Sequence, residues 1–342
     1  MKTKGWSVSP SPYILTRPTV SRMSVVTSLT LAPQVLILIL VGDTSALINL
    51  AAALTGSVIA ELCMSIPDRK NSFGDGVVIL AGLLTGLLLP TTLSPFIALG
   101  VSFSGFLVSR VLFGGTGSYW LHPVATAVCI AFISQKEIFP QLLVSVDGMR
   151  MAGDAFGALK MDHFIQIGSD QSIASNLNST ILGFFGIKLP EGYITLFGNS
   201  PSIIPAFRYN IITLFASIIL FAMNIIDWIV PCAFIVTYSL CVRFFSLALF
   251  GFGFSGGDIL FALLTSGILF IAFYLLTDFS TMPRTRTGKT ISGILAGFSA
   301  FILCGPGGSS AGGIFTVFLV NCINPIIEYC ENRIIASVED IA

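Results

Sequence analysis

Long apolar runs separated by short polar breaks recur along the whole of this chain. They lie near 24–43, 46–66, 76–90, 95–112 and 120–135 in the first half, and near 207–224, 227–247, 258–277, 289–304 and 311–327 in the second. A helix that spans a bilayer needs about 20 mostly apolar residues, because hydrocarbon offers no partner for an unpaired backbone group. The pattern therefore predicts an all-α integral membrane protein with about ten transmembrane helices.

Composition and charge agree with a membrane location. Of 342 residues, 54% are hydrophobic and only 10% are charged, which is too few charges to cover a soluble globule of this size. The net charge is zero and the basic residues are spread over several loops, so the chain gives no reason to expect nucleic acid as a partner.

The distribution of basic residues predicts the orientation in the membrane. With ten spans, one side carries Lys2, Lys4, Arg17, Arg22, Arg69, Lys70, Arg110, Arg284, Arg286, Lys289 and Arg333. Short loops rich in Lys and Arg stay in the cytoplasm. We therefore expect both termini in the cytoplasm and the long segment 136–206 outside. The polar first twenty residues do not resemble a cleavable signal peptide.

Two stretches repeat the same order of features. Residues 82–117, "GLLTGLLLPTTLSPFIALGVSFSGFLVSRVLFGGTG", are echoed by residues 273–308, "FYLLTDFSTMPRTRTGKTISGILAGFSAFILCGPGG". Each has an apolar helix, a break with Thr and Pro, a second apolar helix and a glycine cluster. This indicates two inverted five-helix repeats, although membrane helices also reuse Gly, Thr and Pro without any repeat.

These boundaries divide the chain into five parts. We expect a cytoplasmic N-terminal arm (1–23), a first five-helix membrane repeat (24–135), an extracytoplasmic loop (136–206), a second five-helix membrane repeat (207–327) and a cytoplasmic tail (328–342).

Polar residues within or beside membrane spans are candidate functional groups, because burying them in hydrocarbon is costly. Asp278 ends a long apolar run, and Ser280 and Thr281 follow it with the hydroxyl oxygens that hard cations accept as ligands. The three residues suggest an ion path or a cofactor pocket. The structural alternative is a helix cap in which Asp278 pairs with Arg284 or Arg286. Arg110 is expected to extend its side chain to the membrane interface, with the binding of an anionic cofactor as the alternative.

The cysteines and histidines give no sign of a metal centre. The seven cysteines contain no C-x-x-C pair, and all but Cys330 fall in apolar runs, so small buried side chains are the simplest interpretation. Only two histidines are present, His122 and His163, and they are far apart in sequence. No metal ligands are predicted within the chain, and the alternative is that Cys129 and Cys304 face an iron–sulfur cluster of a neighbouring subunit.

Several motifs in order resemble one known family. The arm "SPYILTRPTVSRMS", the stretch "DGVVILAGLLTGLLLPTTLSP", "SRVLFGGTG", "LLTDFSTMPRTRTGKTISG" and the closing "GGIFTVFLVNCINPIIE" together resemble the RnfD subunit of Rnf electron-transport complexes. They are similar, more distantly, to the NqrB subunit of sodium-pumping NADH:quinone reductases. The resemblance covers nearly the whole chain.

The NqrB/RnfD resemblance implies a function and partners. It implies a multi-pass subunit of the bacterial cytoplasmic (inner) membrane that carries FMN, joined through its phosphate to a hydroxyl in the extracytoplasmic loop. It also implies electron transfer coupled to sodium or proton translocation, with the other Rnf subunits and a flavin transferase as partners. A second, non-covalent flavin such as riboflavin is left open.

The resemblance places the covalent FMN on Ser175. The family's attachment sequence runs approximately Ser-Gly-Ala-Thr after an Asp, and the matching residues here are 172–175 after Asp170. This chain departs from that pattern with Ser for Thr at the acceptor, with Ile173 for Gly and with Asp170 one residue closer. Ser172 is another expected contact, and the side-chain amides of Asn176 and Asn178 could hydrogen-bond the flavin edge.

Alternatives to flavin attachment remain at the sequence level. Asp, Ser and Asn commonly form turns and helix caps, so the stretch could be an unmodified surface helix, or the flavin could be joined to Ser172 or Thr180. If the loop carries no flavin, the chain could be a structural assembly subunit. It could also be a redox-silent channel or transporter for a small solute, since a doubled five-span plan would serve that function as well.

Overall fold

The computed structural model describes residues 18–68, 73–113, 119–139, 167–186, 188–250, 258–305 and 311–339, and all regular structure in these ranges is helical. The predicted all-α class is therefore confirmed. The elements of the first half are α1 (Val20–Val41), α2 (Thr44–Asp68), η1 (Phe73–Asp75), α3 (Val77–Leu88), α4 (Pro95–Phe113), α5 (Pro123–Ser134) and η2 (Lys136–Ile138).

The remaining elements belong to the middle segment and the second half. They are α8 (Asp170–Thr180), η3 (Leu182–Phe185), α9 (Tyr193–Gly198), η4 (Pro205–Phe207), α10 (Asn210–Ala222), α11 (Ile229–Phe250), α12 (Ile259–Thr265), α13 (Ile268–Phe270), the π-helix Ile271–Leu275, α14 (Arg286–Cys304) and α15 (Gly312–Glu339).

Each apolar run contains at least one helix, but the helices differ in length. Within the described part of the chain, four are long and apolar enough to cross a membrane by themselves: α1, α2, α14 and α15. The run at 258–277 is divided into α12, α13 and the π-helix, because Gly267 adopts a left-handed φ of 70° after Ser266. Helix α15 continues beyond residue 327 to Glu339. Ten crossings stay a prediction.

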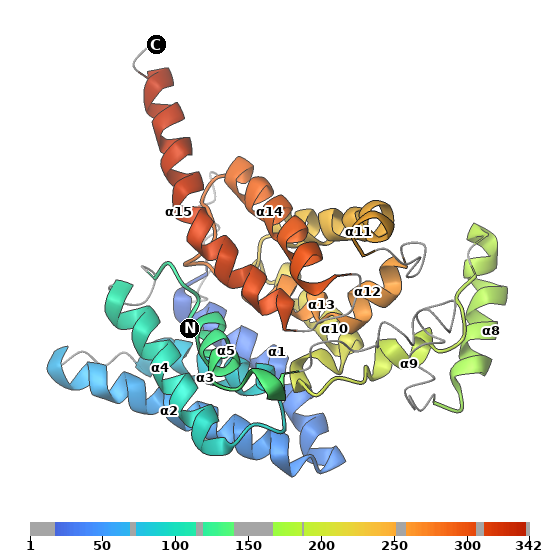
Figure 1. The fold of residues 1–342 in the computed structure, drawn as a ribbon, viewed down its shortest axis with the longest axis horizontal. Coiled ribbons are helices and arrows are strands. Elements are labelled where there is room, and N and C mark those ends of the chain that lie inside the picture. The colour runs from blue at the N-terminus through green and yellow to red at the C-terminus, as the bar shows by residue number, and fades with distance from the viewer. Residues whose placement is uncertain are drawn as a thin grey trace, which may run out of the picture.

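In the first half, helix α2 packs against both α3 and α4, and α4 packs against α5 (Figure 1). Glycine makes the closest approach possible: a Cβ added at Gly56 of α2 would lie 2.4 Å from the carbonyl oxygen of Leu99 in α4. A Cβ at Gly105 of α4 would lie 2.5 Å from the backbone of Ala127 in α5. Small residues at such contacts let membrane helices pack backbone to backbone.

The second half contains a similar set of contacts. Helix α14 packs against α11 and then against α15. A Cβ added at Gly297 of α14 would lie 2.7 Å from the carbonyl oxygen of Phe234 in α11, and one at Gly293 would lie 2.9 Å from that of Val230. Both glycines therefore bring α14 against the backbone of α11.

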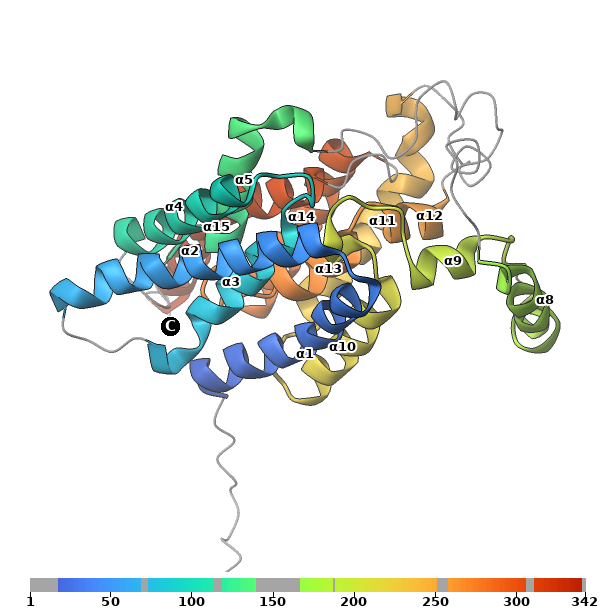
Figure 2. The same cartoon turned by 90° about the horizontal axis from the view of Figure 1, so that it is seen from below.

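The two sets of helices meet along several contacts. Helix α1 packs against α10, where Gln34 donates a hydrogen bond to Thr213 at 3.0 Å, and Phe132 of α5 packs edge-on against Phe315 of α15. In both views, α8 lies at the periphery of the molecule and α9 lies between it and the other helices (Figures 1 and 2). The candidate flavin segment is thus separate from the packed helices.

Candidate functional site

The segment proposed to carry the flavin forms helix α8 (Asp170–Thr180). Sequence reasoning left open a loop and a capped surface helix over residues 175–186. The structure has a helix, but it begins at Asp170 and ends at Thr180, so Ser175 lies inside it rather than at its cap. Ser169 precedes it without capping it through its side chain. The polar residues of this segment are therefore explained by exposure and by contacts outside α8.

Asp170 anchors α8 to the following segment. Its side chain is buried, and its carboxylate accepts hydrogen bonds from the backbone N–H groups of Gly192 and Thr195, each at 2.7 Å, and from the Thr195 hydroxyl. These groups lie at the start of α9, where unpaired N–H groups favour a negative charge. Asp170 thus caps α9 and fixes its position relative to α8.

A second contact fixes the other end of α8 and engages Asn178, one of the two asparagines expected at the flavin edge. The Asn178 side chain accepts a hydrogen bond from Leu189 N at 2.8 Å and donates one to Leu189 O at 2.9 Å. Both anchors join residues that are ten or more positions apart in sequence. Sequence patterns within α8 gave no signal for them.

The hydroxyl groups of α8 lie on its exposed side. Ser175 is exposed, and its Oγ donates a hydrogen bond to the carbonyl oxygen of Ser172 at 2.9 Å. Ser172 and Asn176 are exposed as well. Of the four residues expected at the flavin site, the structure therefore places Ser172, Ser175 and Asn176 at the surface, whereas Asp170 points inward to α9.

Asp278 lies at the break between the π-helix and α14. Its Oδ1 is 3.5 Å from the hydroxyl of Tyr119, which donates to it, and Ser280 Oγ donates to the carbonyl oxygen of Tyr119 at 3.3 Å. Tyr119 shortly precedes α5, so a residue of the first half contacts the break in the second half. This contact was not predicted from the sequence.

A small cavity lies beside Asp278. Its volume is about 40 Å³, and its polar lining comes from Ser24 and Thr27 of α1 and from Tyr274, Thr277 and Asp278. Asp278 Oδ2 is buried and has no hydrogen-bond partner among the described residues. The volume fits a water molecule or a small cation, whereas pockets for drug-sized ligands are several hundred Å³. The cavity is therefore too small for a flavin ring.

Two of the residues grouped with Asp278 in the sequence do not line this cavity. Thr281 is buried, and its carbonyl oxygen accepts a hydrogen bond from Asn324 Nδ2 at 2.7 Å, while Ser280 contacts Tyr119. Both hold the break in place. Ser24 and Thr27 line the cavity instead, and the sequence analysis did not single them out. Two hydroxyl residues three positions apart in an apolar run were a detectable signal.

The alternative pairing for Asp278 is not present. The ion pairs found within the described ranges join Arg110 to Glu61, Arg208 to Asp43, and Lys289 to Asp227. None involves Asp278, so a cap paired with Arg284 or Arg286 does not explain its position.

The expectation for Arg110 is wrong. Its side chain is buried rather than extended to the interface, because it forms an ion pair with the buried Glu61 of α2 and lies over the ring of Phe106. A buried charge is tolerated when an opposite charge compensates it. The pair therefore joins α2 and α4 near their carboxyl ends.

Comparison with known proteins gives a consistent result across the chain. Residues 7–336 match the model of the NQR2, RnfD, RnfE family. The D subunit of the ion-translocating oxidoreductase complex of Salmonella arizonae is 26% identical, with 94% of this chain and 96% of that protein aligned. The proteins of the same name from Escherichia coli K12 and Shigella dysenteriae are each 25% identical over the same shares. The chain belongs to the NQR2, RnfD, RnfE family.

Proposed function

We propose that this protein is the RnfD membrane subunit of an Rnf-type ion-translocating oxidoreductase complex and carries FMN as a phosphoester on Ser175. Its similarity to RnfD proteins along nearly their full length supports the complex. The observation that carries the flavin site is the exposed hydroxyl of Ser175 at the family's acceptor position, on a helix anchored at both ends.

The residues present fit a covalently attached flavin. Among the described residues, the Ser175 hydroxyl is bonded only to a carbonyl oxygen one helical turn away, and Ser175 is exposed, which suits attack by a flavin transferase. Exposed Asn176 beside it offers an amide that can hydrogen-bond the flavin. When bound, the flavin supplies the electron-transfer chemistry, and the protein positions it and tunes its surroundings.

We further propose that the chain crosses the bacterial inner membrane ten times in two inverted repeats, with both termini in the cytoplasm. The contacts along the helix pairs support the repeat, because corresponding helices of each half run in the same directions relative to one another. In the first half α2 and α4 run parallel and α5 antiparallel to them, and in the second half α11 and α14 run parallel and α15 antiparallel to them. The buried pair Glu61–Arg110 and the pair Asp227–Lys289 join the corresponding helix pairs.

The cavity beside Asp278 is the proposed cation position on the coupling path. Sodium and protons both suit a carboxylate oxygen without a partner, and the hydroxyls of Ser24, Thr27 and Thr277 supply further oxygen atoms. The cavity lies between α1 and α3 of the first half and the π-helix of the second. A site between two repeats is the usual arrangement in membrane transporters.

The flavin proposal is tested on the complex expressed with its own flavin transferase. A phosphoester survives denaturation, whereas a non-covalent flavin is released, so the polypeptide should fluoresce on a denaturing gel. The signal should be lost in Ser175→Ala and retained in Ser175→Thr, because only the hydroxyl is required. Ser172→Ala is the matched control, since Ser172 is exposed on the same helix and should keep the signal.

Two results would contradict this assignment. Fluorescence that persists in Ser175→Ala would move the acceptor to another hydroxyl of α8, which mass spectrometry of the peptide would identify. A wild-type polypeptide without fluorescence would mean that α8 carries no covalent flavin, and the protein would then serve transport or assembly.

A further inference from the structure

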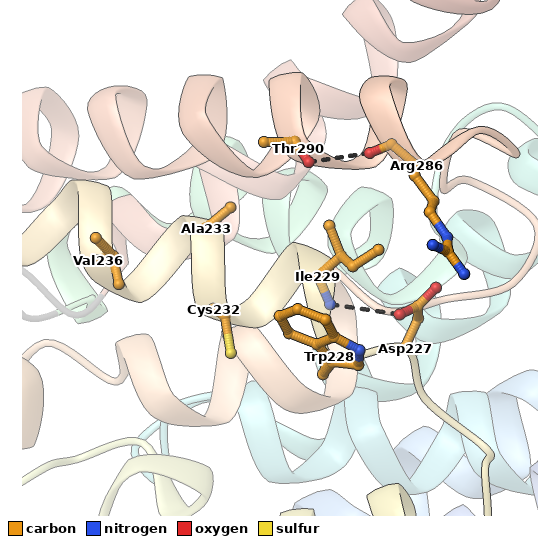
Figure 3. A pocket seen from close by; sticks show the side chains of 8 residues that line it. All are labelled: Asp227, Trp228, Ile229, Cys232, Ala233, Val236, Arg286 and Thr290. Carbon is orange, nitrogen blue, oxygen red and sulfur yellow. Dashed lines mark hydrogen bonds between the residues drawn. The ribbon is translucent and has the colours of Figure 1, made fainter.

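A second, larger groove lies at the start of helices α11 and α14. It has a volume of about 610 Å³ and is lined by Asp227, Trp228, Ile229, Cys232, Ala233, Val236, Arg286 and Thr290. Figure 3 shows the side chains of α11 along one side of it and those of Arg286 and Thr290 of α14 along the other. Neither the flavin nor the proposed cation path uses this groove.

One end of the groove is polar and positively charged. Figure 3 shows Arg286 pointing toward Asp227, and Asp227 Oδ2 is also 2.6 Å from Lys289 Nζ. The Asp227 carboxylate therefore faces two basic side chains. Exposed Arg284 lies two residues before Arg286, and the Glu331 carboxylate accepts hydrogen bonds from Thr285 and Thr287 at the same end of α14. These three basic and two acidic side chains leave one net positive charge, which favours an anionic group there.

The other end of the groove is apolar. From Trp228 to Val236 the lining follows two turns of α11, about 12 Å along the helix axis. Beyond the groove, both helices continue with exposed apolar side chains: Leu240 and Phe244 on α11, and Ile291, Ile294, Phe298 and Ile302 on α14. The two parallel helices thus form a continuous apolar surface that starts at the charged end.

Trp228 marks the level of the membrane interface. Its side chain is 65% exposed at the polar end of the groove, and exposed Trp is enriched where headgroups meet hydrocarbon. The basic residues at this end lie on the side expected to be cytoplasmic, where anionic lipids attract Lys and Arg.

We propose that this groove binds one anionic phospholipid of the cytoplasmic leaflet. The headgroup phosphate lies at Arg286 beside Trp228, and an acyl chain follows the groove past Cys232 and Val236 between α11 and α14. A protein partner would also bury the apolar surface, but the order of a positive end, an interfacial indole and then apolar side chains matches the parts of a phospholipid.

The test uses the whole complex purified in mild detergent and analysed by native mass spectrometry with added phosphatidylglycerol or phosphatidylcholine. Arg286→Gln should weaken phosphatidylglycerol binding about fivefold, the loss expected for one basic contact at a membrane surface. Arg333→Gln removes the same charge from an exposed position on α15 and should bind as the wild type does. Equal binding in both variants would overturn the proposal.

A second measurement on the wild-type complex needs no variant to assemble. Phosphatidylglycerol with a photoreactive group in its acyl chain, in vesicles, should label the peptide that contains Cys232 and Val236. The phosphatidylcholine analogue should label it several times less. Equal labelling by both lipids, or no labelling of this peptide because another protein of the complex covers it, would refute a bound anionic lipid.

Discussion

The carboxylate groups of Asp170 and Asp278 have opposite surroundings. Asp170 accepts hydrogen bonds from Gly192 and Thr195 and therefore has a structural role at the start of α9. Asp278 Oδ1 accepts one long hydrogen bond from Tyr119, and the backbone N–H groups of residues 279–281 lie near the carboxylate. Asp278 lines the small cavity, and its Oδ2 has no hydrogen-bond partner among the described residues. An unsatisfied buried oxygen is costly unless something binds it, so Asp278 is the better candidate for a cation ligand.

Replacing Asp170 should loosen the α8–α9 segment without affecting the membrane helices. Asp170→Ala leaves the first N–H groups of α9 without their acceptor, at a cost of about 1–3 kcal/mol. We expect faster protease cleavage between residues 167 and 198 at an unchanged level of assembled complex. Ser172→Ala, on the exposed side of α8, is the control. Equal cleavage of both variants would show that Asp170 is not an anchor.

Replacing Asp278 should impair ion coupling rather than flavin attachment. Asp278→Asn keeps the size of the side chain but removes its charge, so a cation in the cavity loses its strongest ligand. Transport should fall or require a higher sodium or proton concentration, while the covalent flavin signal stays at the wild-type level. Glu328→Gln, a carboxylate on α15 that does not line the cavity, should transport normally. Normal transport by Asp278→Asn would return it to a structural role.

At the scale of elements, glycine decides how closely the helices pack. Gly56 and Gly297 each lie against backbone atoms of the neighbouring helix, whereas Gly100 of α4 has no atom within 4 Å of a Cβ built on it. A Cβ on Gly56 or Gly297 would lie 2.4 or 2.7 Å from a carbonyl oxygen of the neighbouring helix. These oxygens cannot move away without shifting the helix that carries them. The α2–α4 and α11–α14 contacts therefore require glycine at these positions, because its side chain is a single hydrogen atom.

Adding a methyl group at these contacts should destabilise the protein. Gly56→Ala and Gly297→Ala force the paired helices apart at a cost of about 1–3 kcal/mol. A lower thermal unfolding temperature of the purified complex is the expected result. Gly100→Ala, with open space around it, should be neutral or slightly stabilising, because Ala favours helix. If all three variants have the same thermal unfolding temperature, close packing at glycine does not stabilise the α2–α4 and α11–α14 helix pairs.

The sequence predicted the elements better than their contacts. Apolar periodicity located the helices of both halves, because bilayer-spanning segments need long apolar runs. It did not predict the interruption at Gly267 or the contact of Tyr119 with Asp278. For α8, local composition left both a turn and a helix open and did not give the helix start at Asp170, and the groups that Asp170 and Asn178 bind lie at distant positions. Interactions between distant positions leave no mark in a local pattern.

At the scale of the molecule, an ion pair joins the two halves at one end. Arg208, which precedes α10, donates a hydrogen bond at 2.6 Å to Asp43, which lies between α1 and α2. Burial raises the pKa of the Asp43 carboxyl, but hydrogen bonds from Arg208 and from Ala46 N outweigh it and lower the pKa below its usual 3.8. Asp43 is therefore ionised at neutral pH and the pair is intact.

This pair should give a stability difference that depends on pH. Because the folded-state pKa is depressed, its contribution is present above the usual pKa of 3.8 and is lost as the pH falls through the lower folded value. Asp43→Asn should lower the free energy of unfolding by about 1 kcal/mol at neutral pH, the upper range for a partly exposed pair. Thermal unfolding measured from pH 7 downward should show that the stability difference between the wild type and Asp43→Asn shrinks below about pH 4. A difference that is constant with pH would exclude the ion pair as its cause.

The inverted arrangement makes one further prediction, which concerns the two faces of the membrane. If the basic loops stay in the cytoplasm, α8 lies outside and the end of α15 lies inside. A variant that retains only Cys330, which is exposed on α15, should react with a membrane-impermeant maleimide only after the cells are opened. In a second variant, from which all seven native cysteines have been removed, Ser175→Cys should react in cells whose inner membrane is intact.

Labelling of residue 175 only after the cells are opened would place α8 in the cytoplasm, and the ten-span arrangement with an external flavin would then be wrong. Labelling of Cys330 in intact cells would instead mean that the number of crossings is odd or that the whole orientation is reversed. The two positions together distinguish these cases, because a reversed chain exchanges both results and an odd number of crossings changes only one.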